Sequence, residues 1–192
     1  MKKITYAGLF GLMAIAAIVS CKNETKVTAN TEITQDSLIR RGDYLVATMG
    51  CDDCHSPKKM GPKGPEIDMD RRLSGHPADM KPGKVDLSVM KEGWVLFNMQ
   101  QTAAVGPWGM SFAANITSDN TGIGDWSEEQ FFKAMKHGKY KGLDGSRPLL
   151  PPMPWQAFTK MHDNDLKAIF AYLKSTKPVE NLVPSAKPIT EL

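Results

Sequence analysis

Cysteine is scarce in this chain, which has three among 192 residues, at Cys21, Cys51 and Cys54. After Cys21 only one pair remains, and this excludes a disulfide framework, because small exported disulfide scaffolds carry several pairs. Net charge is low as well. The formal charge is +3, and it falls to +1 without the first 20 residues, which hold two lysines and no acid. A near-neutral chain gives no sign of nucleic-acid binding, for which a clustered basic face is expected.

Long hydrophobic runs are also missing. The apolar run from Ala7 to Val19 follows two lysines and is shorter than the ~20 residues that span a membrane. A charged start before a short apolar stretch is typical of a secretory signal. The residues Ile18-Val19-Ser20-Cys21 resemble a bacterial lipobox. This resemblance implies cleavage after residue 20, lipidation of Cys21, and export to the periplasmic or cell-surface side of a bacterial membrane. The alternatives are an ordinary signal peptide with an incidental cysteine, or an uncleaved anchor helix.

The sequence Cys51-Asp52-Asp53-Cys54-His55 has the pattern C-x-x-C-H, which is typical of c-type haem attachment. Two thiols separated by two residues lie on one turn of backbone, so each can form a thioether with one of the two vinyl groups of a haem. The adjacent His55 is then placed under the iron as the proximal axial ligand. The motif occurs once, which predicts one covalent haem c.

Other C-x-x-C sites bind zinc or catalyse thiol redox chemistry. A structural zinc site needs about four ligands, and only Cys51, Cys54 and His55 are adjacent here. A thioredoxin-like site requires a strand–helix–strand context, which the sequence pattern does not indicate. Haem attachment is therefore the favoured interpretation.

Residues 36–50 are predicted to form a helix, because apolar residues recur along one face at helical spacing. Asp36 or Ser37 is the expected N-cap. Gly50 ends the helix and places Cys51 directly after it.

Residues 127–137 form a second expected helix, with Ser127 and Gln130 in a capping-box pattern and Gly138 at its end. Amphipathic spacing predicts a third helix over 163–175.

Asp163 is the expected cap of this third helix. Residues 21–35 are polar and predicted to be a flexible tether, and residues 179–192 an extended C-terminal tail. The domain itself is predicted to span 36–178.

Residues 56–115 are rich in proline and glycine, which interrupt regular structure. We expect mainly loops here. Within 86–99 the pattern allows either one short helix or a strand that includes Trp94, Leu96 and Phe97.

The order helix, C-x-x-C-H, loops, helix, methionine-containing loop and helix resembles the class I cytochromes c across residues 36–178. The resemblance is closest to the cytochrome subunits of bacterial membrane-bound alcohol and gluconate dehydrogenases. It implies an all-α cytochrome c fold wrapped around one haem, with a long loop-rich insert. The matching segments are Asn115-Ile116-Thr117, residues 121–131, Leu149-Leu150-Pro151-Pro152-Met153-Pro154-Trp155 and residues 165–173.

Those relatives usually carry several haem domains and a shorter stretch after the haem histidine. Here there is one motif and an insert over residues 56–114. The resemblance therefore implies a single-haem electron carrier, not an enzyme, tethered to a membrane by its lipid anchor. Its expected redox partners are a membrane dehydrogenase or a terminal oxidase.

Met153 is the predicted second axial ligand of the iron. The resemblance places the distal methionine in this segment, and the prolines around Met153 stiffen the loop that presents it. A rigid loop matters because a neutral thioether is a weak ligand. The rival methionine and histidine ligands, none of which lies in a constraining motif, are Met110, Met161, His76, His137 and His162.

The other ring nitrogen of a ligating histidine needs a hydrogen-bond acceptor that fixes its orientation. The resemblance assigns this role to the carbonyl of a proline after glycine, for which Pro65 is the candidate and Pro62 the runner-up. Trp108 and Trp126 are candidate walls of the haem pocket or ring N–H donors to the propionates, although each can equally be core packing. The family pattern also predicts a close structural contact between Gly42 and Tyr172.

Three functions remain open for such a haem. A carrier keeps both axial ligands while the iron cycles between ferric and ferrous states. A peroxidase-like catalytic haem or a gas sensor needs an open or labile sixth position. A stably bound Met153 favours the carrier.

Overall fold

The computed structural model describes residues 34–192. The predictions for the signal peptide, Cys21 and most of the tether lie outside the described residues. None of the helices between residues 34 and 192 is both long enough and apolar enough to cross a membrane.

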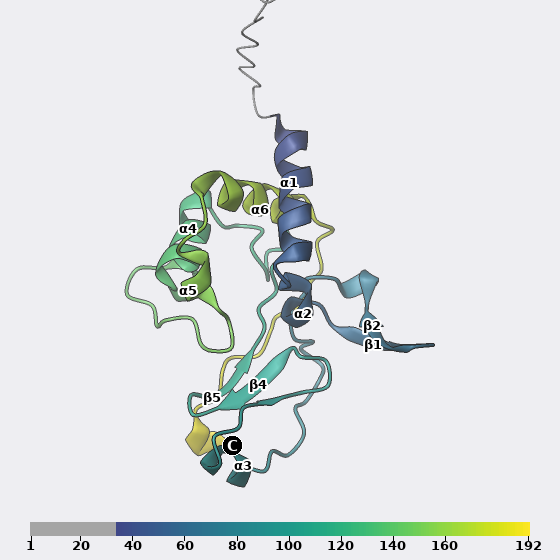
Figure 1. Cartoon of the computed structure of the whole chain (residues 1–192), viewed down its shortest axis with the longest axis vertical. Coiled ribbons are helices and arrows are strands. Elements are labelled where there is room, and N and C mark those ends of the chain that lie inside the picture. Colours follow the sequence, from purple (N-terminus) through teal and green to yellow (C-terminus); the bar gives the residue numbers. More distant parts are fainter. Residues whose placement is uncertain (1–33) are drawn as a thin grey trace, which may run out of the picture. The chain divides into compact units, whose positions relative to one another are not determined.

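Three longer helices are present, and each agrees with a predicted one within one or two residues (Figure 1). They are α1 (Gln35–Thr48), α4 (Glu128–His137) and α6 (Asp163–Ser175). The short helices are α2 (Cys51–His55), α3 (Ser88–Lys91) and α5 (Trp155–Phe158), with 3-10 turns η1 (Met69–Arg71), η2 (Tyr140–Gly142) and η3 (Ile189–Glu191).

Two predicted caps are wrong. The N-cap of α1 is Thr34, whose hydroxyl accepts a hydrogen bond from the Ser37 backbone N–H at 3.2 Å. The N-cap of α6 is His162, which makes no side-chain cap bond. Asp163 is the first helical residue instead, and its carboxylate pairs with Lys136 of α4. The capping rule considers only neighbouring residues, so it could not predict this ion pair between Lys136 and Asp163.

Helix α4 confirms its predicted ends. Ser127 and Gln130 form a complete capping box, and Gly138 adopts the left-handed conformation at φ 61°. The Trp155 ring of α5 lies against Gly138, so that a Cβ there would be 2.4 Å from the ring. This contact joins the end of α4 to the segment that follows Met153.

Helices α1 and α6 cross closely at Gly42 (Figure 1). A Cβ at this position would lie 2.0 Å from the Ala168 carbonyl oxygen and 2.6 Å from the Cβ of Tyr172. The predicted structural contact between Gly42 and Tyr172 is confirmed.

The hydrophobic core lies among α1, α4, α5 and α6 and the loops between them. Its fully buried centre includes Val46 of α1 and Leu166 of α6. Partly buried side chains that pack against this core include Cys51, Trp126 and Met153.

The all-α prediction is only partly right, because the insert contains two small antiparallel sheets. Strands β1 (Lys58–Gly61) and β2 (Gly64–Ile67) form a hairpin. Strands β3 (Leu96–Phe97), β4 (Ala103–Gly106) and β5 (Gly109–Phe112) form a three-stranded sheet in that order. Both alternatives for residues 86–99 occur, as α3 followed by β3. These strands have two to four residues, too few for an alternating pattern to stand out.

The C-terminal tail, residues 179–192, contains the 3-10 turn η3 and is anchored to the insert. Met110 of β5 and Lys187 exchange backbone hydrogen bonds of 2.8 and 2.9 Å. The Asn181 side-chain amide donates to the carbonyls of Ser74 and His76. The tail thereby covers the outer edge of β5 and fixes the sheet against the rest of the domain.

Candidate functional site

The C-x-x-C-H motif forms the one-turn helix α2. Gly50 takes the left-handed conformation (φ 72°), which ends α1 and redirects the chain into α2. Cys51, Cys54 and His55 stand at positions i, i+3 and i+4, so they share one helix face. Both thiols are free and partly buried. The backbone thus places two thiols and one imidazole together, as the spacing predicts.

His55 is oriented by the insert. Its Nδ1–H donates to the Ala114 carbonyl at 2.7 Å. This bond fixes the tautomer and leaves the Nε2 lone pair available, and within residues 34–192 Nε2 has no hydrogen-bond partner. Burial lowers the pKa of His55, although the Ala114 bond opposes the shift. The neutral ring that results is the form that ligates iron.

The predicted acceptor Pro65 is therefore wrong, and so is the runner-up Pro62. Pro65 is exposed on β2, opposite Met60, and Pro62 lies in the hairpin turn. The two prolines belong to a β-hairpin, and neither of their carbonyls accepts the hydrogen bond from His55. The carbonyl comes instead from Ala114, directly before the Asn-Ile-Thr segment. Sequence alone gave no signal for this acceptor, because any residue can supply a carbonyl.

The thiols are unsuited to redox catalysis as free cysteines. Burial, followed by the nearby Asp52 carboxylate, raises the pKa of Cys51 to about 11. Burial also raises the pKa of Cys54. Catalytic cysteines have lowered pKa values, because the thiolate is the nucleophile. Among the described residues, no group of three or more His, Cys, Asp or Glu side chains is arranged to bind a metal ion. Thiol redox chemistry and structural zinc both lose support.

A buried ion pair under α2 was not predicted. The Asp52 carboxylate, 8% exposed, receives two bonds from Arg72, from Nε at 2.9 Å and from Nη2 at 2.7 Å. Ser56 donates a third at 2.7 Å. Burial disfavours the charge, but these bonds outweigh it and lower the pKa of Asp52. Asp52, one of the two x positions of C-x-x-C-H, thus joins the motif to the rest of the domain through Arg72.

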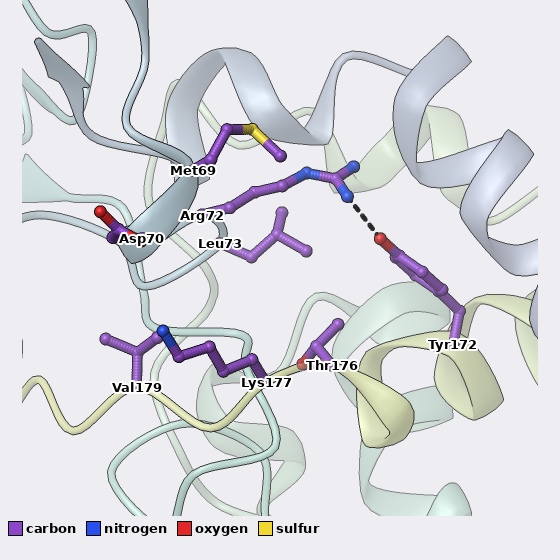
Figure 2. A pocket seen from close by; sticks show the side chains of 8 residues that line it. All are labelled: Met69, Asp70, Arg72, Leu73, Tyr172, Thr176, Lys177 and Val179. Atoms are coloured by element: carbon purple, nitrogen blue, oxygen red, sulfur yellow. Dashed lines mark hydrogen bonds between the residues drawn. The ribbon is translucent and has the colours of Figure 1, made fainter.

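Arg72 extends this network to the helix crossing. Its Nη1 donates to the Tyr172 hydroxyl at 2.6 Å (Figure 2), and Asp43 of α1 lies 3.8 Å from the same nitrogen. Burial and the Asp43 carboxylate raise the pKa of Tyr172 to about 12. Beside this bond lies a cavity of about 160 Å³ that none of the predicted haem-contacting residues lines. Its walls are Met69, Asp70, Arg72, Leu73, Tyr172, Thr176, Lys177 and Val179.

Met153 lies in a loop whose backbone hydrogen bonds run within the loop and to the end of α4. Its backbone N–H donates to Leu150 at 3.3 Å, and the Leu149 N–H donates to Gly138 at 2.7 Å. The peptide bond between Pro151 and Pro152 is cis. Met153 packs partly buried against the same core cluster as Cys51. Its bond to the iron stays a prediction.

The rival distal ligands lie in different surroundings. His76 is fully buried in the insert, where both ring nitrogens are engaged, Nδ1 with the Thr102 hydroxyl and Nε2 with the Met80 carbonyl. Met110 is buried in β5, His137 and His162 are exposed, and Met161 packs partly buried against the core.

The two candidate pocket tryptophans differ. The Trp108 ring N–H donates to Ser111 within the same β-hairpin at 3.1 Å, and its role as a propionate donor stays a prediction. Trp126 packs partly buried against the core. That either ring forms a wall of the haem pocket stays a prediction.

The donor set fits a c-type haem. Two neutral thiols on one helical turn suit thioether formation, and an imidazole with a fixed Nδ1–H and an available Nε2 suits axial ligation.

Comparison with known proteins agrees with this chemistry, although no protein-family model matches the chain. The gluconate 2-dehydrogenase cytochrome c subunit of Pantoea cypripedii is 28% identical over 173 residues, which are 90% of this chain. The cytochrome c subunit of the quinone alcohol dehydrogenase of Gluconobacter oxydans is 26% identical over 175 residues. The fructose dehydrogenase cytochrome subunit of Gluconobacter japonicus is 41% identical over 83 residues, 42% of this chain.

The chain spans about a quarter of the length of the first and second of these relatives, 28% and 27%. The predicted resemblance is confirmed, and such cytochrome c relatives imply haem c and electron transfer. The chain is a homologue of the cytochrome c subunits of bacterial gluconate, fructose and alcohol dehydrogenases, which are electron carriers rather than catalytic subunits.

Proposed function

We propose that this protein is a membrane-tethered electron carrier with one covalent haem c. Cys51 and Cys54 form the two thioethers, His55 is the proximal ligand and Met153 the distal one. The single observation that carries the proposal is the geometry of α2, where both thiols and the imidazole share one face and Ala114 fixes the ring. When bound, the haem supplies an iron that gains and loses one electron.

The residues of the chain have separate tasks in this proposal. Ala114 keeps the His55 ring in place through the Nδ1 bond, and Asp52 with Arg72 fastens the helix that carries both cysteines. The proline-rich loop would supply Met153 as the second ligand. Two ligands held by the fold would limit rearrangement when the iron changes charge, which suits electron transfer better than substrate turnover.

The expected partner is a dehydrogenase, because the relatives are subunits of dehydrogenases by name. A terminal oxidase is the alternative partner. Either would meet the chain near the haem edge at Cys51 and Cys54, through a small transient interface.

Absorption spectroscopy of the exported protein tests the ligands. Met153→Ala is expected to abolish the methionine–iron charge-transfer band, whereas Met161→Ala, which removes a neighbouring partly buried methionine, is expected to retain it. A band that persists in Met153→Ala would reject Met153 as the ligand. A Cys51→Ala/Cys54→Ala double variant is expected to lose covalently bound haem on denaturing gels, and retained haem would reject the attachment site.

Carbon monoxide separates the carrier from a sensor or a peroxidase-like haem. With Met153 firmly bound, the reduced wild type is expected to bind carbon monoxide poorly at neutral pH, and Met153→Ala readily. Equal and ready binding by both proteins would contradict the carrier.

A further inference from the structure

We propose that Ser111, in the insert, is a positioning residue that holds the Met153 loop and thereby sets how firmly the sixth ligand is bound. This inference rests on the proposed ligation by Met153. It gives the insert, which departs from the family pattern, a part in tuning the haem.

The contact is a partly buried hydrogen bond between the sheet and the loop. Ser111 lies on β5 and is 7% exposed, and its hydroxyl donates to the Pro151 carbonyl at 2.6 Å. The Ala104 carbonyl is also in reach, but at 3.5 Å. A hydroxyl has one hydrogen to donate, and the shorter contact to Pro151 takes it.

Trp108 orients this hydroxyl. Its ring N–H donates to the Ser111 oxygen at 3.1 Å, which leaves the hydroxyl hydrogen free to point to Pro151. The indole packs against Gly106 of its own hairpin, where no side chain is in the way. A Cβ on Gly106 would come within 2.4 Å of the ring. Gly106 thus leaves room for the Trp108 ring in a position from which its N–H donates to Ser111.

The loop depends on this bond because it has few others. Pro151, Pro152 and Pro154 have no backbone N–H. The fastenings at Leu149 and Trp155 both run to Gly138 at the end of α4. Among the hydrogen bonds of residues 34–192, only the one from Ser111 joins residues 149–154 to the sheet.

The bond therefore acts two residues before Met153, and it comes from the sheet rather than from α4. The sheet that supplies it is itself fixed, since Met110, next to Ser111, exchanges backbone bonds with Lys187. Loss of the Ser111 hydroxyl would free the loop from the sheet. The Met153 sulfur would then dissociate from the iron more often. A competing ligand then reaches the iron at lower concentration.

Imidazole titration of the ferric holo-protein measures this competition. Because a net hydrogen bond of this kind is modest, Ser111→Ala is expected to lower the half-saturating imidazole concentration roughly 3- to 10-fold. The reduction potential is expected to fall with it, because methionine ligation raises the potential. Ser111→Thr keeps the hydroxyl and is expected to restore wild-type values. Ser175→Ala, which removes a comparable hydroxyl-to-carbonyl bond of 2.7 Å on α6, is the matched control and is expected to leave both quantities unchanged.

Wild-type imidazole binding and potential in Ser111→Ala would overturn the proposal, as would equal shifts in Ser111→Ala and Ser175→Ala. If Ser111→Ala does not fold, Trp108→Phe carries the test. It removes the N–H donor but keeps an aromatic ring, and an unchanged imidazole concentration in this variant would also overturn the proposal. Met153→Ala runs alongside. A retained methionine–iron band there rejects the ligation itself, whereas a lost band with an unaffected Ser111→Ala rejects only the role of Ser111.

Discussion

At the scale of single residues, Asp52 is the buried charge that fixes helix α2, which carries the C-x-x-C-H motif. Its carboxylate accepts bonds from Arg72 and Ser56. Removing one partner of a buried pair leaves the other uncompensated, so Asp52→Ala is expected to lower the free energy of unfolding by about 3 kcal/mol. Urea denaturation of the holo-protein measures this. Asp144→Ala is the control, because its bond to Lys133 is exposed and such surface pairs contribute little to stability. Equal losses in both variants would contradict the assignment.

The same carboxylate makes stability depend on acidity. The folded pKa of Asp52 is lowered, so the unfolded state binds more protons between the two pKa values. The stabilisation is complete above the ordinary aspartate pKa of about 4 and is lost as pH falls through the folded value. Other acids behave similarly, so the informative quantity is the difference between proteins. From pH 5 to pH 3 the urea midpoint of Asp52→Asn is expected to fall less than that of the wild type. Parallel curves would refute the role of Asp52.

His76 is expected to act in a higher pH range. Burial lowers its pKa, although the Met80 carbonyl and Asp79 oppose the shift. The neutral ring donates from Nε2 to Met80 and accepts from the Thr102 hydroxyl. Stability is therefore full above the ordinary histidine pKa of about 6.5 and declines as pH falls through the lower folded pKa. We expect this decline in the wild type and not in His76→Gln, by thermal unfolding of the holo-protein between pH 7 and 5. His137 is exposed, so His137→Gln is the control and should lose stability with falling pH as the wild type does. The same loss of stability in His76→Gln would show that His76 is not its source.

At the scale of elements, the crossing of α1 and α6 leaves no room for a methyl group at Gly42. A Cβ would lie 2.0 Å from the Ala168 carbonyl oxygen, so Gly42→Ala must force the helices apart. Overpacking of this kind costs about 1–3 kcal/mol, and we expect the upper end because the obstacle is backbone. Gly83→Ala is the matched control, since no atom lies within 4 Å of its Cβ position. Urea denaturation should show a change below about 0.5 kcal/mol for the control, and a similar result for Gly42→Ala would disprove the close crossing.

The elements also show what the sequence could predict. The bounds of α4 follow from Ser127, Gln130 and Gly138, because capping chemistry is local. The strands β4 and β5 could not be found in this way. All of β4 is buried, so it lacks alternation, and its pairing depends on a hairpin in which Gly106 faces Gly109.

The candidate site likewise has features that local sequence predicts and features that depend on distant residues. The shared face of Cys51, Cys54 and His55 is fixed by spacing within one turn. The acceptor for His55 is a carbonyl 59 residues away, and no residue type marks a carbonyl. The contact from Asp52 to Arg72 likewise joins positions 20 residues apart through a loop that has no periodic pattern.

At the scale of the whole molecule, the insert and the tail support the candidate site from several directions. The insert ends at Ala114, which holds His55, and it supplies Arg72 to the α2 helix and Ser111 to the Met153 loop. The tail then fixes the insert through Lys187 and Asn181. Relatives more than three times as long place this homologous region beside further sequence. In this chain, contacts within the described residues hold both α2 and the loop that carries Met153.

The membrane tether and the haem are expected to be separable in the whole protein. If Cys21 is lipidated, Cys21→Ser should move the protein from the membrane fraction to the soluble fraction and leave its haem absorption unchanged, because the site lies between residues 51 and 153. The Cys51→Ala/Cys54→Ala variant should do the reverse, with haem lost and the membrane association kept. Lys22→Ala, next to the cysteine, is the matched control and should remain in the membrane fraction. An uncleaved anchor helix would keep Cys21→Ser in the membrane, because the apolar run from Ala7 to Val19 is intact. Fractionation followed by haem staining therefore distinguishes the lipid anchor from that alternative in one experiment.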